Sequence, residues 1–194
     1  MQPLLMSAEL PLITSRDVTY IAEHKTTRSS LSDITTYFDS NSENEIKLDS
    51  MSTQAQGVYE IYSDFARTHP ELAYLYIGTS EGGYLQWPTG KLGAHYDPRP
   101  RPWYKAGQAT KETPKLTEAY YWEPDDAVII SMVRTVTSDS GNISGVQGMD
   151  IELNQLTEML MDVEVGIGGY MILSETNSGN VLADASNPNN NFKH

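Results

Sequence analysis

Prolines at alternate positions constrain the middle of this chain more than any other feature of the sequence. The segment 95–104 reads His-Tyr-Asp-Pro-Arg-Pro-Arg-Pro-Trp-Tyr. Proline fixes its own φ and restricts the residue before it, so Asp97, Arg99 and Arg101 are directed toward extended conformations. Guanidinium groups suit carboxylates, and aromatic rings supply walls. The segment is therefore either one wall of a small-molecule pocket or a structural surface loop in which arginine stacks on tryptophan.

The balance of charge limits the classes of partner. The 194 residues carry 26 acidic and 13 basic side chains, a formal net charge of −13. Nucleic-acid backbones and anionic membrane surfaces are therefore not expected as partners. The absence of cysteine excludes disulfides, thiolate catalysis and cysteine metal sites. With 39% hydrophobic residues and no apolar run of about 20 residues, we expect a soluble chain with one core and part of a second module.

Two segments near the N-terminus show helical periodicity. Apolar and aromatic residues at helical spacing predict a helix over Leu31–Phe38. A longer rhythm of the same kind predicts a second helix over Met51–Phe65, which Pro70 stops. The polar cluster Ser40–Asn44 is a break between the two. We expect the aromatic residues of these helices to pack into the core.

From residue 72 onward the period changes from helix to strand. A hairpin, a short helix and three further strands are expected, and the order indicates a mixed helix and sheet domain. In chain order these elements are Leu72–Ile77, a turn at Glu81–Gly83, Tyr84–Trp87, a helix over Trp103–Ala109 begun by Pro102, and strands over Lys115–Tyr121, Ala127–Thr137 and Ile143–Ile151.

The C-terminal part predicts an incomplete second module. A short helix over Glu152–Met161 leaves the sheet, and Gly166–Gly169 forms a joint. Two short strands, Tyr170–Ser174 and Asn180–Asp184, form a second hairpin, and the asparagine-rich residues 187–191 are typical of a disordered tail. Because two strands do not make an independent domain, we expect this part to be the opening of a second module.

Four segments follow one another in a recognisable order: Leu75–Thr79, Tyr96–Ala106, Thr117–Tyr120 and Gly145–Ile151. In this order they resemble the double Cache sensor domains of bacterial and archaeal chemoreceptors, histidine kinases and cyclic-dinucleotide signalling proteins. The resemblance implies an α+β fold, with a long N-terminal helix followed by a PAS-like antiparallel sheet. It assigns 1–70 to an N-terminal helical segment, 71–165 to the membrane-distal Cache module that binds the ligand, and 166–194 to the beginning of the membrane-proximal module.

The same resemblance implies a function. Such a domain lies outside the cytoplasm, binds a small ligand such as an amino acid or a related molecule, and passes the signal through the membrane to a cytoplasmic output domain. It further implies a homodimer through the N-terminal helix and membrane attachment through flanking helices outside this chain. No cofactor and no catalysis are expected.

The resemblance also carries over a set of ligand-binding residues: Tyr96, Arg101, Trp103, Tyr104, Tyr120, Trp122 and Asp150. Arg101 and Trp103 match the pair that contacts a ligand carboxylate. Asp150 and Tyr120 match the residues at the amino end of the ligand. A zwitterion needs a cation at one end, an anion at the other and apolar walls between them, and these residue types meet that need.

One position departs from the amino-acid-binding pattern. Trp122 stands where the pattern has a second acid, so a bound ammonium would lose one charged partner. A register slip of one residue makes Glu123 that acid, and the Trp122 ring can itself face a cation. The alternative is a different ligand, such as a carboxylate without an amine, an amine or another small nitrogen compound.

Other interpretations of single residues stay open. Asp150 ends a strand just before a helix, where aspartate is also suited to cap the helix. Asp97 and Arg99 are expected to hold their loop together rather than to contact ligand. For the whole chain the alternative is a non-sensing dimerisation or adhesion domain with a structural Arg-aromatic loop. A hydrolase using the acids of 123–126 has no geometric support, and the four histidines share no zinc spacing, so no catalytic or metal site is predicted.

Overall fold

An antiparallel sheet organises the part of the chain that the computed structural model describes, which is residues 31, 33–110, 113–122, 127–138, 140–176 and 178–191. Among these residues six strands form the sheet in the order β3-β2-β8-β7-β5, and β6 also pairs with β7. Each pairing is antiparallel. The strands are β2 (Tyr74–Thr79), β3 (Tyr84–Trp87), β5 (Lys115–Leu116), β6 (Tyr120–Trp122), β7 (Ala127–Thr137) and β8 (Ile143–Glu152). The predicted α+β class is confirmed.

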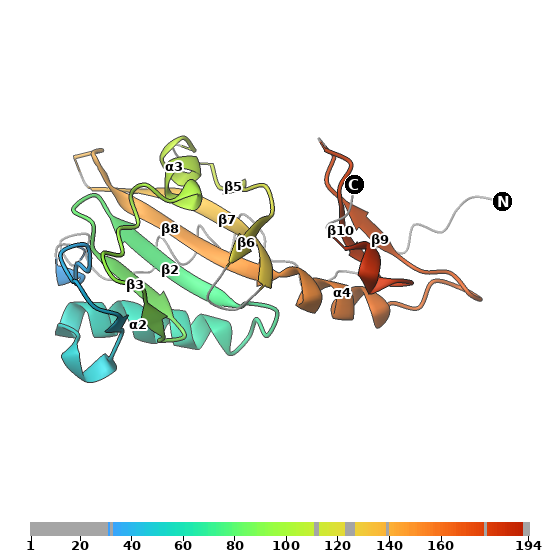
Figure 1. Ribbon diagram of the computed structural model, residues 1–194, viewed down its shortest axis with the longest axis horizontal. Helices are drawn as coiled ribbons and strands as arrows, with labels where there is room; N and C mark the ends of the chain where they lie inside the picture. Colours follow the sequence, from blue (N-terminus) through green and yellow to red (C-terminus); the bar gives the residue numbers. More distant parts are fainter. Residues whose placement is uncertain are drawn as a thin grey trace.

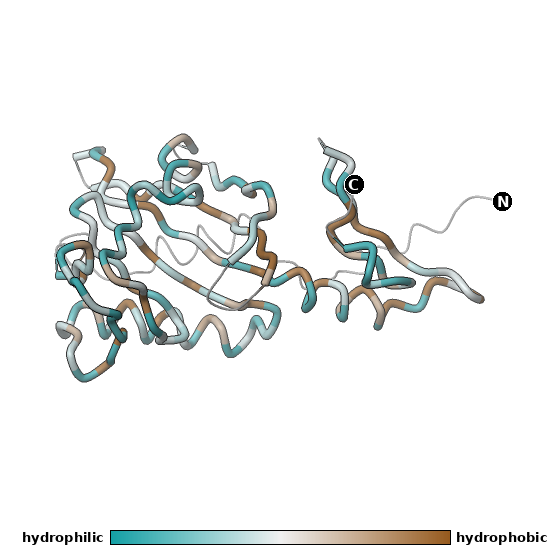
Figure 2. The backbone as a smooth tube through the Cα atoms, in the orientation of Figure 1, coloured by the Kyte–Doolittle hydropathy of each residue, from teal (hydrophilic) through white to brown (hydrophobic). Residues whose placement is uncertain are grey.

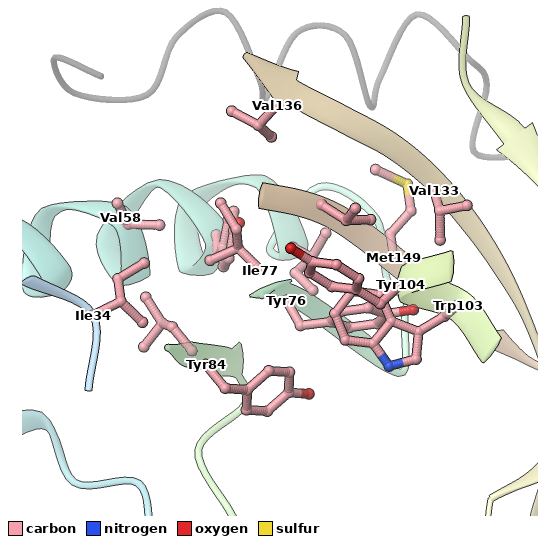
Figure 3. Packing of buried hydrophobic residues seen from close by; sticks show 14 of the residues in the cluster. Ile34, Val58, Tyr76, Ile77, Tyr84, Trp103, Tyr104, Val133, Val136 and Met149 are labelled. Atoms are coloured by element: carbon pink, nitrogen blue, oxygen red, sulfur yellow. The ribbon is translucent and has the colours of Figure 1, made fainter. Parts of the chain in front are cut away.

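Helix α2 (Thr53–Ala66) packs on one face of this sheet and confirms the second predicted helix. Ser52 caps its N-terminus, since the Ser52 side chain accepts a hydrogen bond from the Ala55 amide at 3.1 Å. Val58 and Tyr62 are fully buried on its inner face. Figure 3 shows Val58 of α2 close to Ile77 of β2, so the aromatic and apolar stripe of the helix is core, as predicted.

Helix α3 (Pro102–Gln108) lies on the opposite face of the sheet (Figure 1). Its first residue is proline, which has no amide hydrogen and so suits the start of a helix. Two threonines fix its C-terminal end, because Thr110 Oγ1 and Thr135 Oγ1 both donate to the Gly107 carbonyl, at 2.7 and 2.6 Å. The helix predicted after the proline-rich loop is confirmed and is tied to β7.

The prediction of a helix over Leu31–Phe38 is wrong beyond its start, because Leu31 and Asp33 have 3-10 helical backbone but the residues after them do not. Thr36 forms a bridge with Gly83, and Tyr37 forms one with Tyr96. The apolar residues of this segment are nevertheless buried: Leu31 and Ile34 are 3% and 4% exposed. Pairing with distant strands therefore prevails over the local helical pattern, and the apolar spacing reflects burial rather than a helix. The longer N-terminal helix implied by the resemblance falls largely outside the described residues.

The single strand predicted over Lys115–Tyr121 is divided into β5 and β6. Between them Thr117 binds β7 twice, since its amide donates to the Ser131 carbonyl at 2.8 Å and its Oγ1 accepts from the Ser131 amide at 3.1 Å. One short ribbon and one short helix complete this part of the chain. These are β1 (Asn44–Glu45) paired with β4 (Lys91–Leu92), and the short helix η2 (Leu48–Ser50).

A second, smaller cluster forms around helix α4 (Leu153–Met161), which continues directly from β8. Strands β9 (Ile172–Ser174) and β10 (Val181–Asp184) form a separate ribbon beyond it, as Figure 1 shows. Leu153, Leu156 and Leu160 of α4 pack with Leu182 of β10. In Figure 2 hydrophobic colour runs along the central strands and continues through α4 into this ribbon. The predicted hairpin is thus present, with shorter strands.

The interpretation of residues 187–191 as a disordered tail is wrong. Pro188–Asn190 form a short helix, η4. Asn190 Nδ2 donates to Asp184 Oδ2 at 2.8 Å, and Asn191 Nδ2 donates to Thr157 Oγ1 of α4 at 2.6 Å. Asparagine side chains replace the missing apolar contacts here, so a composition typical of disorder folds back onto the ribbon. No described helix has the length and apolar character needed to cross a membrane.

Candidate functional site

Polar side chains gather on the face of the sheet that α3 covers. Successive residues of a strand point to opposite faces, and the register sets Asp150 of β8 between Tyr74 of β2 and Ser131 of β7. Tyr76 lies in the next row, opposite Gly148. Tyr76, Ser131 and Asp150 therefore share one face although they come from three strands.

Asp150 accepts two short hydrogen bonds on one oxygen. The Tyr76 hydroxyl and the Ser131 hydroxyl both donate to Asp150 Oδ1, each at 2.6 Å. Because the Ser131 proton is used in this way, the Tyr120 hydroxyl is the donor in its 2.9 Å contact with Ser131 Oγ. Asp150 Oδ2 makes no hydrogen bond to any residue that the structure describes. One carboxylate oxygen is fixed and the other stays available.

The capping interpretation of Asp150 is wrong. Glu152, not Asp150, occupies the N-cap of α4, and no side chain makes a capping hydrogen bond there. Asp150 is instead an internal residue of β8, and its side chain points across the sheet.

Gly148 explains how Tyr76 reaches Asp150. The Tyr76 ring lies over Gly148 of the neighbouring strand, where an added Cβ would be 2.5 Å from Tyr76 Cε2 and 2.6 Å from Tyr76 Oη. No side chain tolerates such distances, so any larger residue would displace the ring. The glycine is required because a large ring must lie flat across the sheet at this point.

Burial dominates the electrostatics of this cluster. Removal from water raises the pKa of Asp150 to about 7, although the hydrogen bonds from Ser131 and Tyr76 act in the opposite direction. Burial also raises the pKa of Tyr76 well above its ordinary value, and the nearby Asp150 charge adds to this. Both tyrosine and aspartate are therefore held toward their neutral forms, and an incoming cation would restore the charge on Asp150.

The proline-rich loop is held by its own charged residues, as predicted. Arg99 pairs with Asp97 at 2.8 Å through Nη2, and the Arg99 amide donates to Asp97 Oδ1 at 2.9 Å. The Arg99 guanidinium also lies over the Phe38 ring at 5.0 Å. These contacts give Asp97 and Arg99 a structural role, and Arg101 takes no part in them.

Arg101 is placed differently from Arg99. It occupies the N-cap of α3, and its guanidinium carbon lies 5.0 Å from the centroid of the Tyr96 ring. Its side chain makes no ion pair or hydrogen bond with the described part of the chain. A cation resting on an aromatic face with its donors unused is suited to receive a carboxylate.

Aromatic rings fill the space between the Asp150 cluster and Arg101. Trp103 makes an edge contact with Tyr76, with ring centroids 4.7 Å apart, and Tyr84 lies 4.7 Å from Tyr96. Figure 3 shows Trp103, Tyr104 and Tyr76 grouped together. Tyr104 is 1% exposed and packs beside Trp103, with ring centroids 5.5 Å apart. The rings form a continuous wall from the acid to the arginine.

A cavity of about 480 Å³ opens beside this wall. It is lined by Lys91, Leu92, Gly93, Tyr96, Arg101, Tyr121 and Trp122. Of the residues expected to bind ligand, Tyr96, Arg101 and Trp122 thus lie together at its surface. Tyr120 lines a separate cavity of about 440 Å³ next to α3. Asp150, Trp103 and Tyr104 are buried and line neither cavity.

Sequence reasoning missed three residues of this arrangement: Tyr76, Ser131 and Lys91. Tyr76 lies within the Leu75–Thr79 motif, where strand alternation was a usable signal. Ser131 is a polar residue in the middle of an otherwise apolar buried strand, which also signals a specific partner. Lys91 gives no local signal, because its place depends on the β1–β4 ribbon.

Two hypotheses involve residues 123–126, which lie outside the described residues: Glu123 as the second acid, and a hydrolase that uses these acids. Within the described ranges no cluster of three or more histidine or acidic side chains suits a metal ion. The described site therefore consists of one buried acid, one unpaired arginine and the rings between them.

The sequence also matches a known family. Residues 32–158, well over half of the chain, match the methyl-accepting chemotaxis protein-like first PDC sensor domain. The chain belongs to this family, and the resemblance to chemoreceptor sensor domains is confirmed.

Individual relatives agree with this assignment. The chain is 33% identical to the methyl-accepting chemotaxis protein McpB of Bacillus subtilis over 116 residues, which are 60% of this chain and 17% of McpB. It is 34% identical to PctB of Pseudomonas aeruginosa over 100 residues, which are 52% of this chain and 16% of PctB. The chain therefore spans about one sixth of the length of these relatives.

Solved structures show the same fold. The ligand-binding domain of the Pseudomonas fluorescens chemoreceptor CtaA in complex with L-serine aligns with a TM-score of 0.57 at 28% identity, covering 71% of this chain and 57% of that domain. The ligand-binding domain of the amino acid chemoreceptor PctB of Pseudomonas aeruginosa in complex with L-Arg aligns with a TM-score of 0.54 at 25% identity, covering 69% and 57%.

Proposed function

We propose that this domain senses a small molecule carrying a carboxylate, of which an amino acid is the leading example, outside the cytoplasm. The ligand carboxylate meets Arg101, and its amino end, where present, meets Asp150. The observation that carries this proposal is the placement of an unpaired arginine and a buried acid at opposite ends of one aromatic wall. Amino-acid-bound relatives such as CtaA support the same ligand class.

The remaining candidate residues take roles along the same path. Tyr96 and Trp103 form the wall near the carboxylate, Tyr104 supports Trp103, and Tyr120 acts through Ser131 on Asp150. Trp122 closes the cavity on the side of β6. A ligand would have to move the wall slightly to reach Asp150, because that acid is 4% exposed.

The arrangement of the whole receptor is part of this proposal. Residues 71–165 form the membrane-distal module that binds the ligand, residues 166–194 begin the membrane-proximal module, and two copies pair through a helix within the N-terminal segment 1–70. Helices outside this chain anchor it, and a cytoplasmic output domain receives the signal. The β9–β10 ribbon beyond α4 supports the division near residue 165.

A thermal-shift screen of the 194-residue chain against amino acids, amines, purines and small carboxylates tests the function. A ligand at 100 times its Kd stabilises the folded state by about 2.7 kcal/mol, so its Tm rises by several degrees. If no compound in the screen shifts Tm, the proposal is contradicted.

Arg101→Gln tests the placement of the carboxylate. We expect a loss of affinity of about 10- to 100-fold, because a charge-assisted hydrogen bond contributes about 1.5 to 3 kcal/mol. The matched control is Arg67→Gln, because Arg67 is an exposed arginine at the C-cap of α2 and its partner is Asp64. If Arg101→Gln lowers Tm and leaves ligand affinity unchanged, the proline-rich loop is structural. That result favours the hypothesis of a non-sensing dimerisation or adhesion domain.

A further inference from the structure

The cavity beside the aromatic wall contains two cationic side chains. Lys91 comes from β4 and Arg101 from the start of α3, and both line the same space of about 480 Å³. The other lining residues, Leu92, Gly93, Tyr96, Tyr121 and Trp122, carry no charge near neutral pH. Neither cation makes an ion pair with a residue that the structure describes. A single carboxylate would leave one of the two cations without a partner.

The acid nearest to Lys91 along the ribbon is already engaged. Glu45 of β1 is the direct cross-strand neighbour of Lys91, so the two side chains share a face. Glu45 Oε2, however, pairs with Lys47 Nζ at 3.1 Å, and this contact raises the pKa of Lys47. The group of Lys47, Glu45 and Lys91 therefore keeps one net positive charge.

The buried acid of the site does not offset this charge. Asp150 lies behind Trp103 and Tyr76, and it does not line the cavity. A donor without an acceptor is also found on the cavity wall: the Trp122 indole N–H is buried and has no hydrogen-bond partner among the described residues. The described lining is thus rich in cations and donors and poor in acceptors.

We infer that the ligand carries two acidic groups, one for Arg101 and a second for Lys91. Lys91 is then the residue that selects an acidic ligand over its neutral amide. This inference rests on the proposed function, since it concerns the same cavity. It gives the position of Trp122 a meaning, because an anionic ligand has less need of a second acid there than a neutral zwitterion has.

Two pairs of compounds that differ in one acidic group test this inference by calorimetric titration of the 194-residue chain. L-glutamate and L-glutamine form the first pair, and succinate and its monoamide form the second pair, which lacks the amine. We expect the diacid of at least one pair to bind about 5- to 10-fold more tightly than its amide, an amount that allows for the solvent exposure of Lys91. Raising the salt concentration should reduce this preference.

The variant Lys91→Gln should remove the preference, because it lowers the affinity for the diacid more than the affinity for the amide. Lys105→Gln is the matched control, because Lys105 is an exposed lysine of α3 that does not line the cavity. Equal affinity of acid and amide for the natural chain, or a preference that survives Lys91→Gln, overturns the inference and leaves the proposed function intact. If neither pair binds while a neutral amino acid does, the inference of two acidic groups is contradicted and the proposed function is not. If no compound of any class binds, both this inference and the proposed function are contradicted.

Discussion

The two ends of the candidate site are built on opposite physical principles. The acid end, formed by Asp150, Tyr76, Ser131 and Tyr120, is buried and hydrogen-bonded, and the pKa of its carboxyl is raised to about 7. The cation end, formed by Arg101 and Lys91, is exposed to its cavity and has no ion pair among the described residues. The acid end therefore has fixed geometry at an electrostatic cost, whereas the cation end has its charge freely available and little fixed geometry.

This difference separates two tasks within one site. A buried acid binds a correctly placed ammonium strongly and other groups weakly, because an unpaired charge in a dry environment has a high free energy. Exposed cations attract many carboxylates and discriminate mainly by charge and reach. We therefore expect the acid end to determine how tightly an amine-bearing ligand is held, and the cation end to determine which anions enter.

The largest expected effect on ligand affinity comes from Asp150→Asn. The amide keeps an oxygen for Tyr76 and Ser131 but removes the charge, so affinity for an amino acid should fall about 100-fold. Asp162→Asn, at the exposed end of α4, is the control and should change affinity little. Titration calorimetry measures both. Unchanged affinity in Asp150→Asn would mean that the acid end lies outside the ligand site.

The largest expected effect on stability is its pH dependence without ligand. The folded pKa of Asp150 is about 7, and an unfolded aspartate has a pKa of about 3.9, so between these values the folded state holds a proton that the unfolded state has lost. The stabilisation from this group is therefore fully present below about pH 4 and is lost as pH rises through 7, with a slope approaching about 1.4 kcal/mol per pH unit.

Denaturant unfolding of the natural chain and of Asp150→Asn at several pH values isolates this contribution, because other titrating groups cancel in the difference. The difference in unfolding free energy between the two proteins should change steadily from pH 4 to pH 7 and then level off. A difference that is constant across this range would contradict the dry, costly character of the acid end.

The smallest expected effect compares two buried tyrosines. Tyr76→Phe should lower the free energy of unfolding by about 1 kcal/mol, because it removes the donor to Asp150. Tyr62→Phe is the matched control, since the Tyr62 hydroxyl is buried and no described residue is its hydrogen-bond partner, so its removal should be neutral or slightly stabilising. Urea unfolding measures both. Equal losses would show that the Tyr76 hydroxyl contributes packing and no specific bond.

The sequence predicts the frame of the molecule well wherever local pattern and final structure agree. Ala127–Thr137 and Tyr84–Trp87 form strands with the predicted bounds, because alternation and flanking turns are local signals. The prediction fails over Leu31–Phe38 and over 187–191, where bridges and the hydrogen bond from Asn191 to Thr157 join residues far apart in the sequence. These are contacts that no short window of sequence contains.

The candidate site is predictable to a similar, partial extent. Arg101 and Asp150 are indicated by residue type and motif, but the link from Tyr76 to Asp150 depends on the register of β2 with β8 and on the space above Gly148. Lys91 depends on a ribbon made by two-residue strands, which are too short to leave a pattern. What the sequence leaves open is therefore the relation between strands rather than the chemistry of single residues.

The continuity of β8 with α4 gives the acid end a mechanical role as well. Ile151 and Glu152 alone separate Asp150 from the first residue of α4, and Leu153, Leu156 and Leu160 of that helix pack with β10. A displacement of the Asp150 carboxylate is therefore transmitted along the hydrogen-bonded strand β8 into helix α4, which packs against the β9–β10 ribbon. In the proposed function Asp150 therefore both binds the ligand and lies at the start of a continuous strand and helix that extend beyond the sheet.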